Sequence, residues 1–488
     1  MTSPRINVLR MKENGVVTEI RQDVVHVTGL TNCMNGQLVD IGGKARGVVL
    51  GFNPDYVLVL LVSAAMNIRP GDIVTSVLEE FKVPVGEKYL GRSVNALCEP
   101  MDGHGPIFDT VDYPIFATAP TVLERVPLNQ TMEMGTKIID MMKPVGMGQR
   151  MLVLGDRMTG KTTLCVDAIL NQRGKDVICI YCCIGKSDAS LRKITDLFEK
   201  EKVWGYGIVI AATASDPIGQ QYLAPYVACS LGEYFMLEKQ ADVLIVFDDF
   251  TKHAWAYRQI SLLLERAPGR DAYPGDIFYI HSQLVERACK LNMDRGGGSM
   301  THLPIVETLQ GDLAGYIPSN IVSMTDGQIF TSAQLFGEGF KPAIDMGLSV
   351  SRIGNKVQWH AVRKQTGMLQ LEFVRYKELE KLTRIRAGSS GDVEDRLRRG
   401  RVLEEVLKQD ENNPVPMENE VIILFALHNG FLDDCEPADV RSLLDALIKK
   451  IRRDKPELVR SICEQKMLTE PIRQGLEHEV KSFGPAYV

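Results

Sequence analysis

The feature that most constrains this 488-residue chain is the octapeptide Gly155-Asp-Arg-Met-Thr-Gly-Lys-Thr162, here called the P-loop. It matches the pattern Gly-x-x-x-x-Gly-Lys-Ser/Thr at every fixed position. An apolar run, residues 151–154, precedes it, and a segment with helical spacing, residues 163–171, follows it. A strand that enters such a loop and a helix that leaves it form the context in which the pattern cradles phosphate. The octapeptide therefore predicts an α/β nucleotide-binding domain.

The P-loop predicts a site for ATP or ADP with Mg²⁺. Gly155 and Gly160 let backbone N–H groups curl around phosphate oxygens. Lys161 brings a full positive charge to the outer phosphates, and the Thr162 hydroxyl is suited to ligate Mg²⁺. We expect the whole stretch to take part in binding: Gly155, Asp156, Arg157, Met158, Thr159, Gly160, Lys161, Thr162 and Thr163.

A second acidic motif supports the metal prediction. The apolar run 244–247 ends in Asp248 and Asp249. In nucleotide-binding α/β domains an aspartate at the carboxyl end of a buried strand holds Mg²⁺, often through water. Of the two carboxylates we predict Asp248 as the metal ligand, together with Thr162.

Three patterns divide the chain into expected domains. Residues 1–81 contain short β-branched or alternating runs between glycine-rich turns, which is typical of a β-barrel. In residues 82–360 apolar runs alternate with longer amphipathic stretches, which predicts a parallel sheet covered by helices. Residues 361–488 carry helical spacing and many charges, which favours a helical bundle. The apolar runs expected as strands of the sheet are residues 151–154, 177–181, 208–211, 243–247 and 277–280.

Net charge and cysteine spacing exclude some classes of function. The chain has 56 Lys and Arg against 62 Asp and Glu, a net charge of −6. A nucleic-acid-binding surface requires a basic excess, so no nucleic-acid partner is expected.

No apolar run reaches the roughly 18 residues of a membrane span, so no direct membrane insertion is expected. Among the ten cysteines, the cluster Cys179, Cys182 and Cys183 lacks a second ligand pair for zinc, and buried thiols in a strand are expected instead.

Longer motifs resemble one family. Pro342-Ala-Ile-Asp-Met-Gly-Leu-Ser-Val-Ser351 is similar to the motif shared by the alpha and beta subunits of rotary ATPases. Other motifs resemble the alpha subunit of F-type ATP synthases in particular, and together they cover nearly the whole chain. These motifs lie at residues 256–264, 268–278, 296–299, 304–308 and 323–329. The resemblance implies three parts: an N-terminal β-barrel, a central α/β P-loop (RecA-like) nucleotide-binding domain and a C-terminal α-helical bundle.

The resemblance also implies an assembly and a division of labour. Alpha and beta subunits alternate in a hexameric ring around a central-stalk gamma subunit, with peripheral-stalk (stator) subunits outside, and proton transport drives ATP synthesis. Alpha binds nucleotide without turning it over, in a regulatory role. Arg352, which follows the motif, matches the arginine finger that alpha supplies to a beta catalytic site. On the base side of the nucleotide the resemblance matches four positions: Phe336, Lys341, Gln409 and Glu411.

Several positions depart from the family pattern. Met158 and Lys341 stand where alpha subunits carry glutamine and arginine, and Glu411 replaces a second glutamine. Lys186 stands where beta has its catalytic glutamate and alpha usually has glutamine. An ammonium group, whose ordinary pKa is about 10.4, cannot act as a general base at neutral pH. A displaced carboxylate from Asp188 stays open, as do the affinity and base selectivity of the site.

Two other function classes compete with this one. A self-sufficient catalytic ATPase of the same superfamily is disfavoured by Lys186, and a helicase-like nucleic-acid motor by the acidic charge balance. The stretch 296–299 resembles mitochondrial forms, so we predict the matrix face of the mitochondrial inner membrane, with the cytoplasmic face of a bacterial plasma membrane as the alternative. The N-terminal segment is shorter than in the family, so we expect an altered stator protein at the barrel end.

Overall fold

The computed structural model describes residues 12–63, 67–77, 79–385, 391–433 and 435–483. Most of the N-terminal segment expected to meet the stator, residues 1–11, lies outside the described residues. The chain groups into two compact units, each described by itself. Unit 1 comprises residues 1–125, 176–306 and 316–324, and unit 2 comprises residues 126–175, 307–315 and 325–488.

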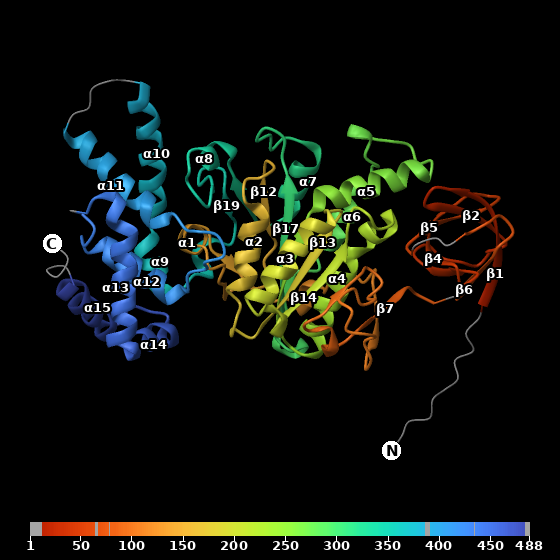
Figure 1. The fold of residues 1–488 in the computed structure, drawn as a ribbon, viewed down its shortest axis with the longest axis horizontal. Coiled ribbons are helices and arrows are strands. Elements are labelled where there is room, and N and C mark those ends of the chain that lie inside the picture. The colour runs from red at the N-terminus through yellow and green to blue at the C-terminus, as the bar shows by residue number, and fades with distance from the viewer. Residues whose placement is uncertain (1–11, 64–66, 78, 386–390, 434, 484–488) are drawn as a thin grey trace, which may run out of the picture. The chain divides into compact units, whose positions relative to one another are not determined.

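The N-terminal part of unit 1 is a closed barrel, as the sequence predicted (Figure 1). Its interior is filled by β-branched and other apolar side chains that alternate along the strands, which include Val25, Val49 and Val59. Closure leaves no unpaired strand edge in this sheet. In spatial order its strands are β1 (Lys12–Arg21), β2 (Val24–Thr28), β5 (Val57–Leu61), β4 (Ala45–Phe52), β3 (Leu38–Ile41) and β6 (Ile73–Val77).

The second part of unit 1 is a parallel sheet with helices between its strands. Its strands are almost entirely buried, which explains their continuous apolar sequences. Cys179, Cys182 and Cys183 lie buried in β13 as expected. In spatial order the strands are β8 (Ser93–Val94), β14 (Gly207–Ala212), β13 (Val177–Ile184), β15 (Asp242–Asp248) and β17 (Ser299–Glu307). The helices are α3 (Asp188–Lys200), α4 (Ile218–Glu238), α5 (Phe250–Leu263), α6 (Ile277–Val285) and α7 (Tyr316–Met324).

One predicted strand is wrong. Residues 277–280 begin helix α6 rather than a strand. Ile277 and His281, four residues apart, are both buried, while Phe278 and Tyr279 between them are exposed. Short apolar runs do not separate helix from buried strand, and here the burial follows the helical period.

Unit 2 contains a short sheet whose middle strand is β18 (Gly327–Thr331). It pairs in parallel with β12 (Met151–Gly155) and in antiparallel with β19 (Val350–Ser351). The P-loop follows β12 and leads into α2 (Lys161–Leu170). Unit 2 also contains α1 (Lys137–Met142), α8 (Ala333–Gly337) and the antiparallel pair β10 (Thr131–Met132) and β11 (Val145–Gly146).

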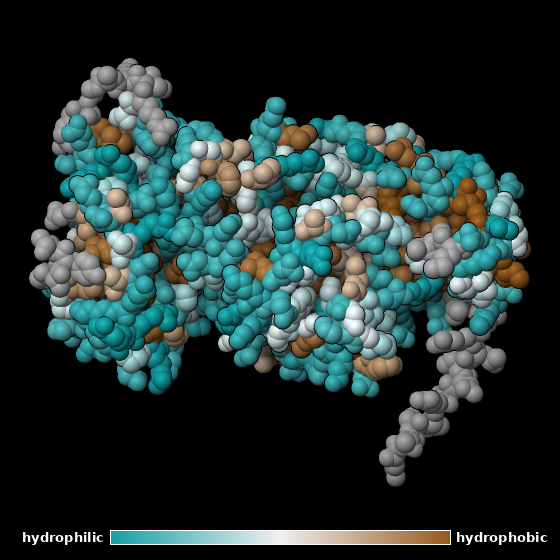
Figure 2. Space-filling model, viewed as in Figure 1, coloured by the Kyte–Doolittle hydropathy of each residue, from teal (hydrophilic) through white to brown (hydrophobic). Residues whose placement is uncertain are grey.

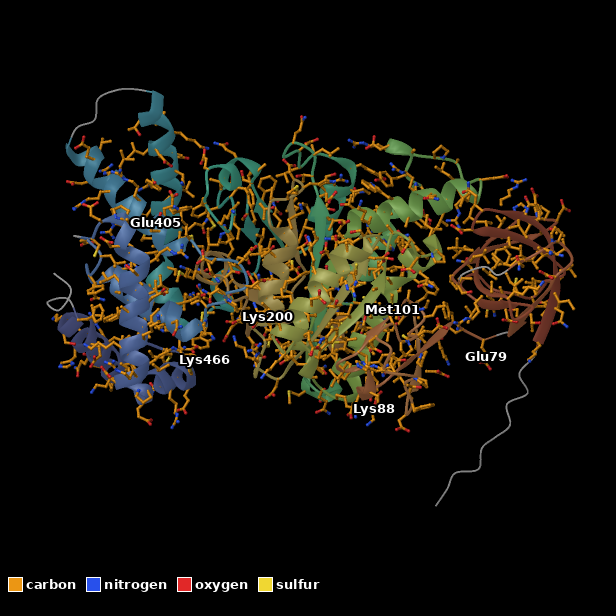
Figure 3. The ribbon with its side chains drawn as sticks, in the orientation of Figure 1. Glu79, Lys88, Met101, Lys200, Glu405 and Lys466 are labelled. Carbon is orange, nitrogen blue, oxygen red and sulfur yellow. The ribbon has the colours of Figure 1, made fainter. Side chains whose placement is uncertain are left out.

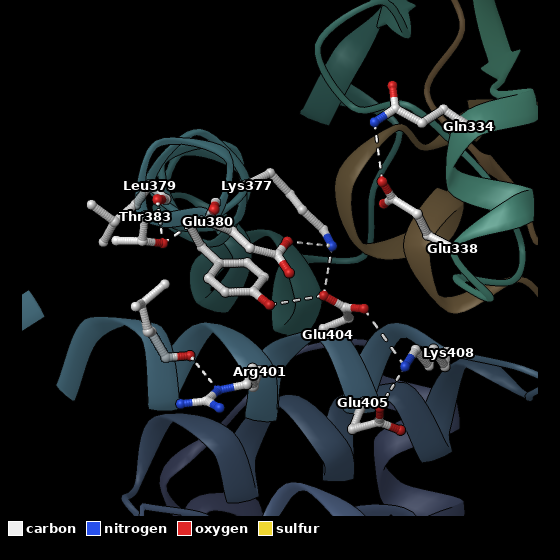
Figure 4. A network of polar contacts seen from close by, with 12 residues as sticks. Gln334, Glu338, Lys377, Leu379, Glu380, Thr383, Arg401, Glu404, Glu405 and Lys408 are labelled. Atoms are coloured by element: carbon white, nitrogen blue, oxygen red, sulfur yellow. Dashed lines mark hydrogen bonds and ion pairs between the residues drawn. The ribbon is translucent and has the colours of Figure 1, made fainter. Parts of the chain in front are cut away.

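The C-terminal part of unit 2 is helical, as predicted (Figure 1). A polar network joins two of its helices: Lys377 pairs with Glu404 at 2.6 Å, and the Tyr376 hydroxyl donates to the same carboxylate at 3.0 Å (Figure 4). The helices are α9 (His360–Thr366), α10 (Leu369–Ile385), α11 (Gly391–Leu407), α12 (Met417–His428), α13 (Val440–Asp454), α14 (Pro456–Gln465) and α15 (Glu470–Phe483).

Candidate functional site

The P-loop backbone depends on two glycines. Gly155 ends β12 with φ of 152°, and a Cβ placed there would collide with the Thr331 side chain and carbonyl on β18. Gly160 takes a left-handed φ of 90° and forms the N-cap of α2. A residue with a side chain is strained at such a φ. The two glycines thus let the chain turn sharply from strand to helix and leave the helix N-terminus facing the loop.

Side chains fix one flank of the P-loop. The Asp156 carboxylate accepts hydrogen bonds from the Thr308 hydroxyl at 2.7 Å and the Gly311 N–H at 2.8 Å. The hydroxyls of Thr159 and Thr331 lie 2.6 Å apart. The exposed Arg157 pairs with Glu307 at 2.9 Å. These contacts anchor the loop to the segment after β17 and to β18.

Lys161 lies inside the P-loop. Only 6% of the residue is exposed, and its ammonium group donates to the carbonyl oxygens of Gly155 at 2.8 Å and Asp156 at 2.5 Å. Thr162 and Thr163 lie half-buried in the first turn of α2, whereas Met158 is 90% exposed. A buried ammonium beside a helix N-terminus can neutralise phosphate charge. The structure therefore brings together all nine P-loop residues predicted from the sequence.

The residues predicted near the nucleotide base occupy two places. Phe336, on α8, and Lys341 lie together, with the lysine ammonium 4.6 Å from the ring centre. Glu411 is exposed. Gln409 is buried: its amide donates to the carbonyls of Gly135 at 2.7 Å and Asn413 at 2.9 Å. The same amide accepts from the Lys137 N–H at 3.0 Å, so its polar atoms are held by the protein itself. The role of these four residues in base binding stays a prediction.

A buried carboxylate of α2 lies beside the segment that carries Gln409 and Glu411. Asp167 accepts the Asn412 N–H at 2.9 Å. Burial raises the pKa of Asp167 to about 7, although this hydrogen bond opposes the shift, and Glu411 adds to it. This carboxyl therefore changes its protonation state within the physiological range.

The predicted metal ligand Asp248 lies in unit 1, fully buried at the carboxyl end of β15. Its Oδ2 accepts the Tyr181 hydroxyl at 2.7 Å, and the Lys186 ammonium lies 2.5 Å from Oδ1. Burial alone would lower the pKa of Lys186, but the nearby Asp248 and Asp249 carboxylates outweigh it and raise the pKa above its ordinary value. Lys186 is therefore a charged partner of Asp248.

Sequence reasoning missed this ion pair, although a signal existed. β13 and β15 are adjacent parallel strands, with Cys183 opposite Asp248. The carboxyl ends of parallel strands lie at one edge of a sheet, so a residue just after Ile184 is placed near Asp248. Asp188, the alternative carboxylate, is exposed at the start of α3 and accepts the Ser215 hydroxyl at 3.2 Å.

Arg352, the predicted finger, directly follows β19 and is exposed. Its backbone N–H donates to the Asp326 carbonyl at 2.8 Å. The Asp326 carboxylate is held by Arg150 through two side-chain contacts of 2.9 and 2.6 Å. On the other side the Ser351 hydroxyl donates to the Pro144 carbonyl at 3.1 Å. The backbone that carries Arg352 is thus fixed on both sides.

Strand register places Arg352 away from the P-loop of its own chain. Gly155 lies opposite Thr331, at the carboxyl end of β18. Ser351 lies opposite Gly327, at the amino end of the same strand. Four residue steps of about 3.3 Å separate these ends, which is about 13 Å along the strand. Arg352 therefore emerges at the end of this sheet opposite the P-loop.

Three family models match the chain. The nucleotide-binding domain of the ATP synthase alpha/beta family matches residues 135–351. The C-terminal domain of the ATP synthase alpha/beta chain matches residues 358–483, and the family's beta-barrel domain matches residues 10–77. Across the part of the chain that the structure describes, no helix has the length and apolar character required to cross a membrane.

Curated relatives agree with these models. ATP synthase subunit alpha of Clostridium botulinum (strain Eklund 17B / Type B) is 44% identical over 475 residues, which cover 97% of this chain and 94% of the relative. The same subunit of Clostridium acetobutylicum is also 44% identical, with the same coverage. That of Aquifex aeolicus is 41% identical over 479 residues, 98% of this chain and 95% of the relative.

Proposed function

Because the chain belongs to the ATP synthase alpha subunit family, we propose that it binds ATP or ADP without hydrolysing it and lends Arg352 to a neighbouring beta subunit. As a family member it is part of a proton-transporting ATP synthase. The arginine finger and the non-catalytic role are the proposed parts of this function.

The pairing register of β18 supports the proposal that Arg352 acts on a different subunit. A finger must reach the transferred phosphoryl group, and Arg352 lies at the strand end opposite its own P-loop. An exposed arginine on a fixed backbone fits action on a different subunit. Its planar guanidinium can bridge two phosphoryl oxygens as charge develops in the transition state.

Among the residues that the structure describes, the position expected to carry the water-activating carboxylate carries a lysine. Lys186 stands at the position expected for a general base, and its ammonium is paired with Asp248. A protonated lysine cannot accept the proton of an attacking water. The proposed role of the site is therefore retention of nucleotide, through the P-loop N–H groups and Lys161.

Mg²⁺, when bound, would neutralise charge on the phosphates. The half-buried Thr162 hydroxyl, next to Lys161 in the first turn of α2, fits the role of its ligand. Asp248 does not fit as well, since both of its oxygens are engaged within the protein.

The proposed partners are beta subunits, a central-stalk gamma subunit and stator subunits. Figure 2 shows hydrophobic residues gathered over the barrel, where Val16, Met34, Phe52 and Ile73 are exposed. Such surface favours a contact with other subunits. The proposed location is the cytoplasmic face of a bacterial plasma membrane, because the relatives above are bacterial. They lend no support to the mitochondrial prediction.

The test compares the purified chain with a complex of the chain and its beta subunit. The chain alone is expected to bind ATP but not to hydrolyse it, while the complex hydrolyses it. Lys161→Ala is expected to remove the nucleotide that the chain retains, because it deletes the charge inside the P-loop. Steady hydrolysis by the chain alone would contradict the non-catalytic role, and unchanged nucleotide content in Lys161→Ala would contradict the binding site.

A further inference from the structure

The two oxygens of Asp248 are both engaged by side chains of the same subunit. Asp248 is fully buried, and Oδ2 accepts the Tyr181 hydroxyl at 2.7 Å. The Lys186 ammonium lies 2.5 Å from Oδ1, and the Lys186 side chain is only 21% exposed. A buried carboxylate that is paired in this way has little net charge left to attract a cation.

The backbone around Lys186 is held by hydrogen bonds on both sides. Gly185 turns the chain after β13 with a left-handed φ of 61°, and its N–H donates to the Ala212 carbonyl at 2.7 Å. The Lys186 carbonyl accepts the Ala214 N–H at 2.8 Å. Ser187 then caps α3, where its hydroxyl accepts the Ser190 N–H. Lys186 is thus held between a strand end and a helix start, beside the end of β15.

This arrangement conflicts with the expected metal role of Asp248. An aspartate at this strand end holds Mg²⁺ directly or through water, and it needs a charged oxygen for that contact. Here an ammonium of the chain already occupies Oδ1. We propose that Lys186 withdraws Asp248 from metal binding, so that this subunit retains its nucleotide with little dependence on Mg²⁺.

The consequence follows from what remains to hold the nucleotide. Of the two predicted ligands, Thr162 is then the one left to the ion, so loss of Mg²⁺ removes little protein contact. Retention then rests on the P-loop backbone, the N-terminus of α2 and Lys161, none of which requires a metal. The inference rests on the proposed nucleotide site and adds a property to it.

The experiment measures nucleotide retained by the complex of this chain with its beta subunit, after gel filtration in Mg²⁺ or in EDTA. The amount of nucleotide retained by the parent complex minus the amount retained by its Lys161→Ala variant gives the nucleotide held at this chain's own site. For the parent we expect this difference to be nearly equal in the two buffers. In Lys186→Gln the carboxylate is released for metal binding, so EDTA is expected to weaken retention by about 10- to 100-fold, the usual effect of an outer-shell metal partner.

Two further variants sharpen the test. Lys200→Gln removes the same charge from the exposed carboxyl end of α3, where Figure 3 labels it, and its retention is expected to be as insensitive to EDTA as that of the parent. In the double variant Lys186→Gln/Asp248→Asn no carboxylate is left to bind metal, so the sensitivity gained by Lys186→Gln is expected to disappear. The double variant also removes the unpaired buried charge, so it separates metal binding from instability.

The outcomes are distinct for the inference and for the proposed site. Release of the Lys161-dependent nucleotide from the parent by EDTA would overturn the inference while leaving the site in place. Sensitivity to EDTA that persists in the double variant would overturn it as well, because the metal would then be held without Asp248. If Lys161→Ala retained as much nucleotide as the parent in both buffers, the proposed site itself would be wrong.

Discussion

The two ends of β18 in unit 2 differ in how their side chains are used. At the carboxyl end, Thr159 contacts Thr331, and Lys161 lies buried on carbonyls of its own loop. At the amino end the backbone is equally fixed, but Arg352 is exposed. Under the proposed function, one end holds a nucleotide of its own and the other presents Arg352 to a neighbouring subunit. With these proposed roles, a single short sheet would separate nucleotide binding from participation in catalysis.

The largest expected effect concerns the exposed end. Arg352→Lys keeps the charge but loses the planar fork, so hydrolysis by the complex is expected to fall by up to about 10³–10⁵-fold, the contribution of such a finger. Steady-state ATPase assays measure it. Arg363→Lys, the same change at an exposed position on α9, serves as the control and is expected to leave the rate unchanged. A rate within a few-fold of the parent for Arg352→Lys would mean that Arg352 is not the finger.

The next effect concerns the ligand-holding end. Gly155→Ala drives a methyl group into Thr331, whereas Gly160→Ala meets no atom within 4 Å and suffers only the cost of its left-handed φ. The first change is expected to lower the free energy of unfolding by about 1–3 kcal/mol more than the second, the usual cost of overpacking. Denaturant titrations of both variants measure the difference. Equal stabilities would mean that Gly155 is not closely packed against β18.

Outside the sheet, Asp167 is expected to make the free energy of unfolding depend on pH. Its folded pKa of about 7 lies above its ordinary value of 3.8, so the folded state binds more protons between these values. The stability that this proton provides is present at low pH and is lost as the pH rises towards 7, with a slope of at most about 1.4 kcal/mol per pH unit. Asp167→Asn keeps an acceptor for the Asn412 N–H and is expected to flatten the slope. An unchanged pH profile in the variant would argue against the raised pKa.

The smallest effect is expected at the rim of the P-loop. The Arg157 side chain is 60% exposed, so its ion pair with Glu307 is screened by solvent. Arg157→Gln is expected to change the free energy of unfolding by less than about 1 kcal/mol. Thermal unfolding of the variant checks this value, and a larger loss would place Arg157 among the residues that hold the loop together.

Local patterns predicted most of the fold. The P-loop residues fix a strand, a turn and a helix within a few positions of one another, and the barrel and helical parts follow from periodicity. The strand prediction for residues 277–280 failed because a short apolar segment fits both the strand period and the helix period. Its packing in the folded protein selected the helix. The exact domain boundaries, 1–81, 82–360 and 361–488, stay a prediction.

The site was less predictable because its decisive relations are long-range. The pairing of Lys186 with Asp248 joins residues at the carboxyl ends of two adjacent strands that are far apart in sequence. The position of Arg352 relative to the P-loop depends on the direction of β19, which no local motif specifies. The residue types indicated the chemistry that each side chain can perform. The order and direction of the strands determined which side chains lie close together.

Under the proposed function, Arg352 stabilises the transition state at another subunit's site. The most direct test is binding of MgADP with and without aluminium fluoride, a mimic of the transferring phosphoryl group, to complexes of parent and Arg352→Lys chains. We expect the Arg352→Lys complex to bind MgADP at the beta sites as the parent does but no longer to trap the fluoride complex there. Equal trapping of the fluoride complex by both would contradict it.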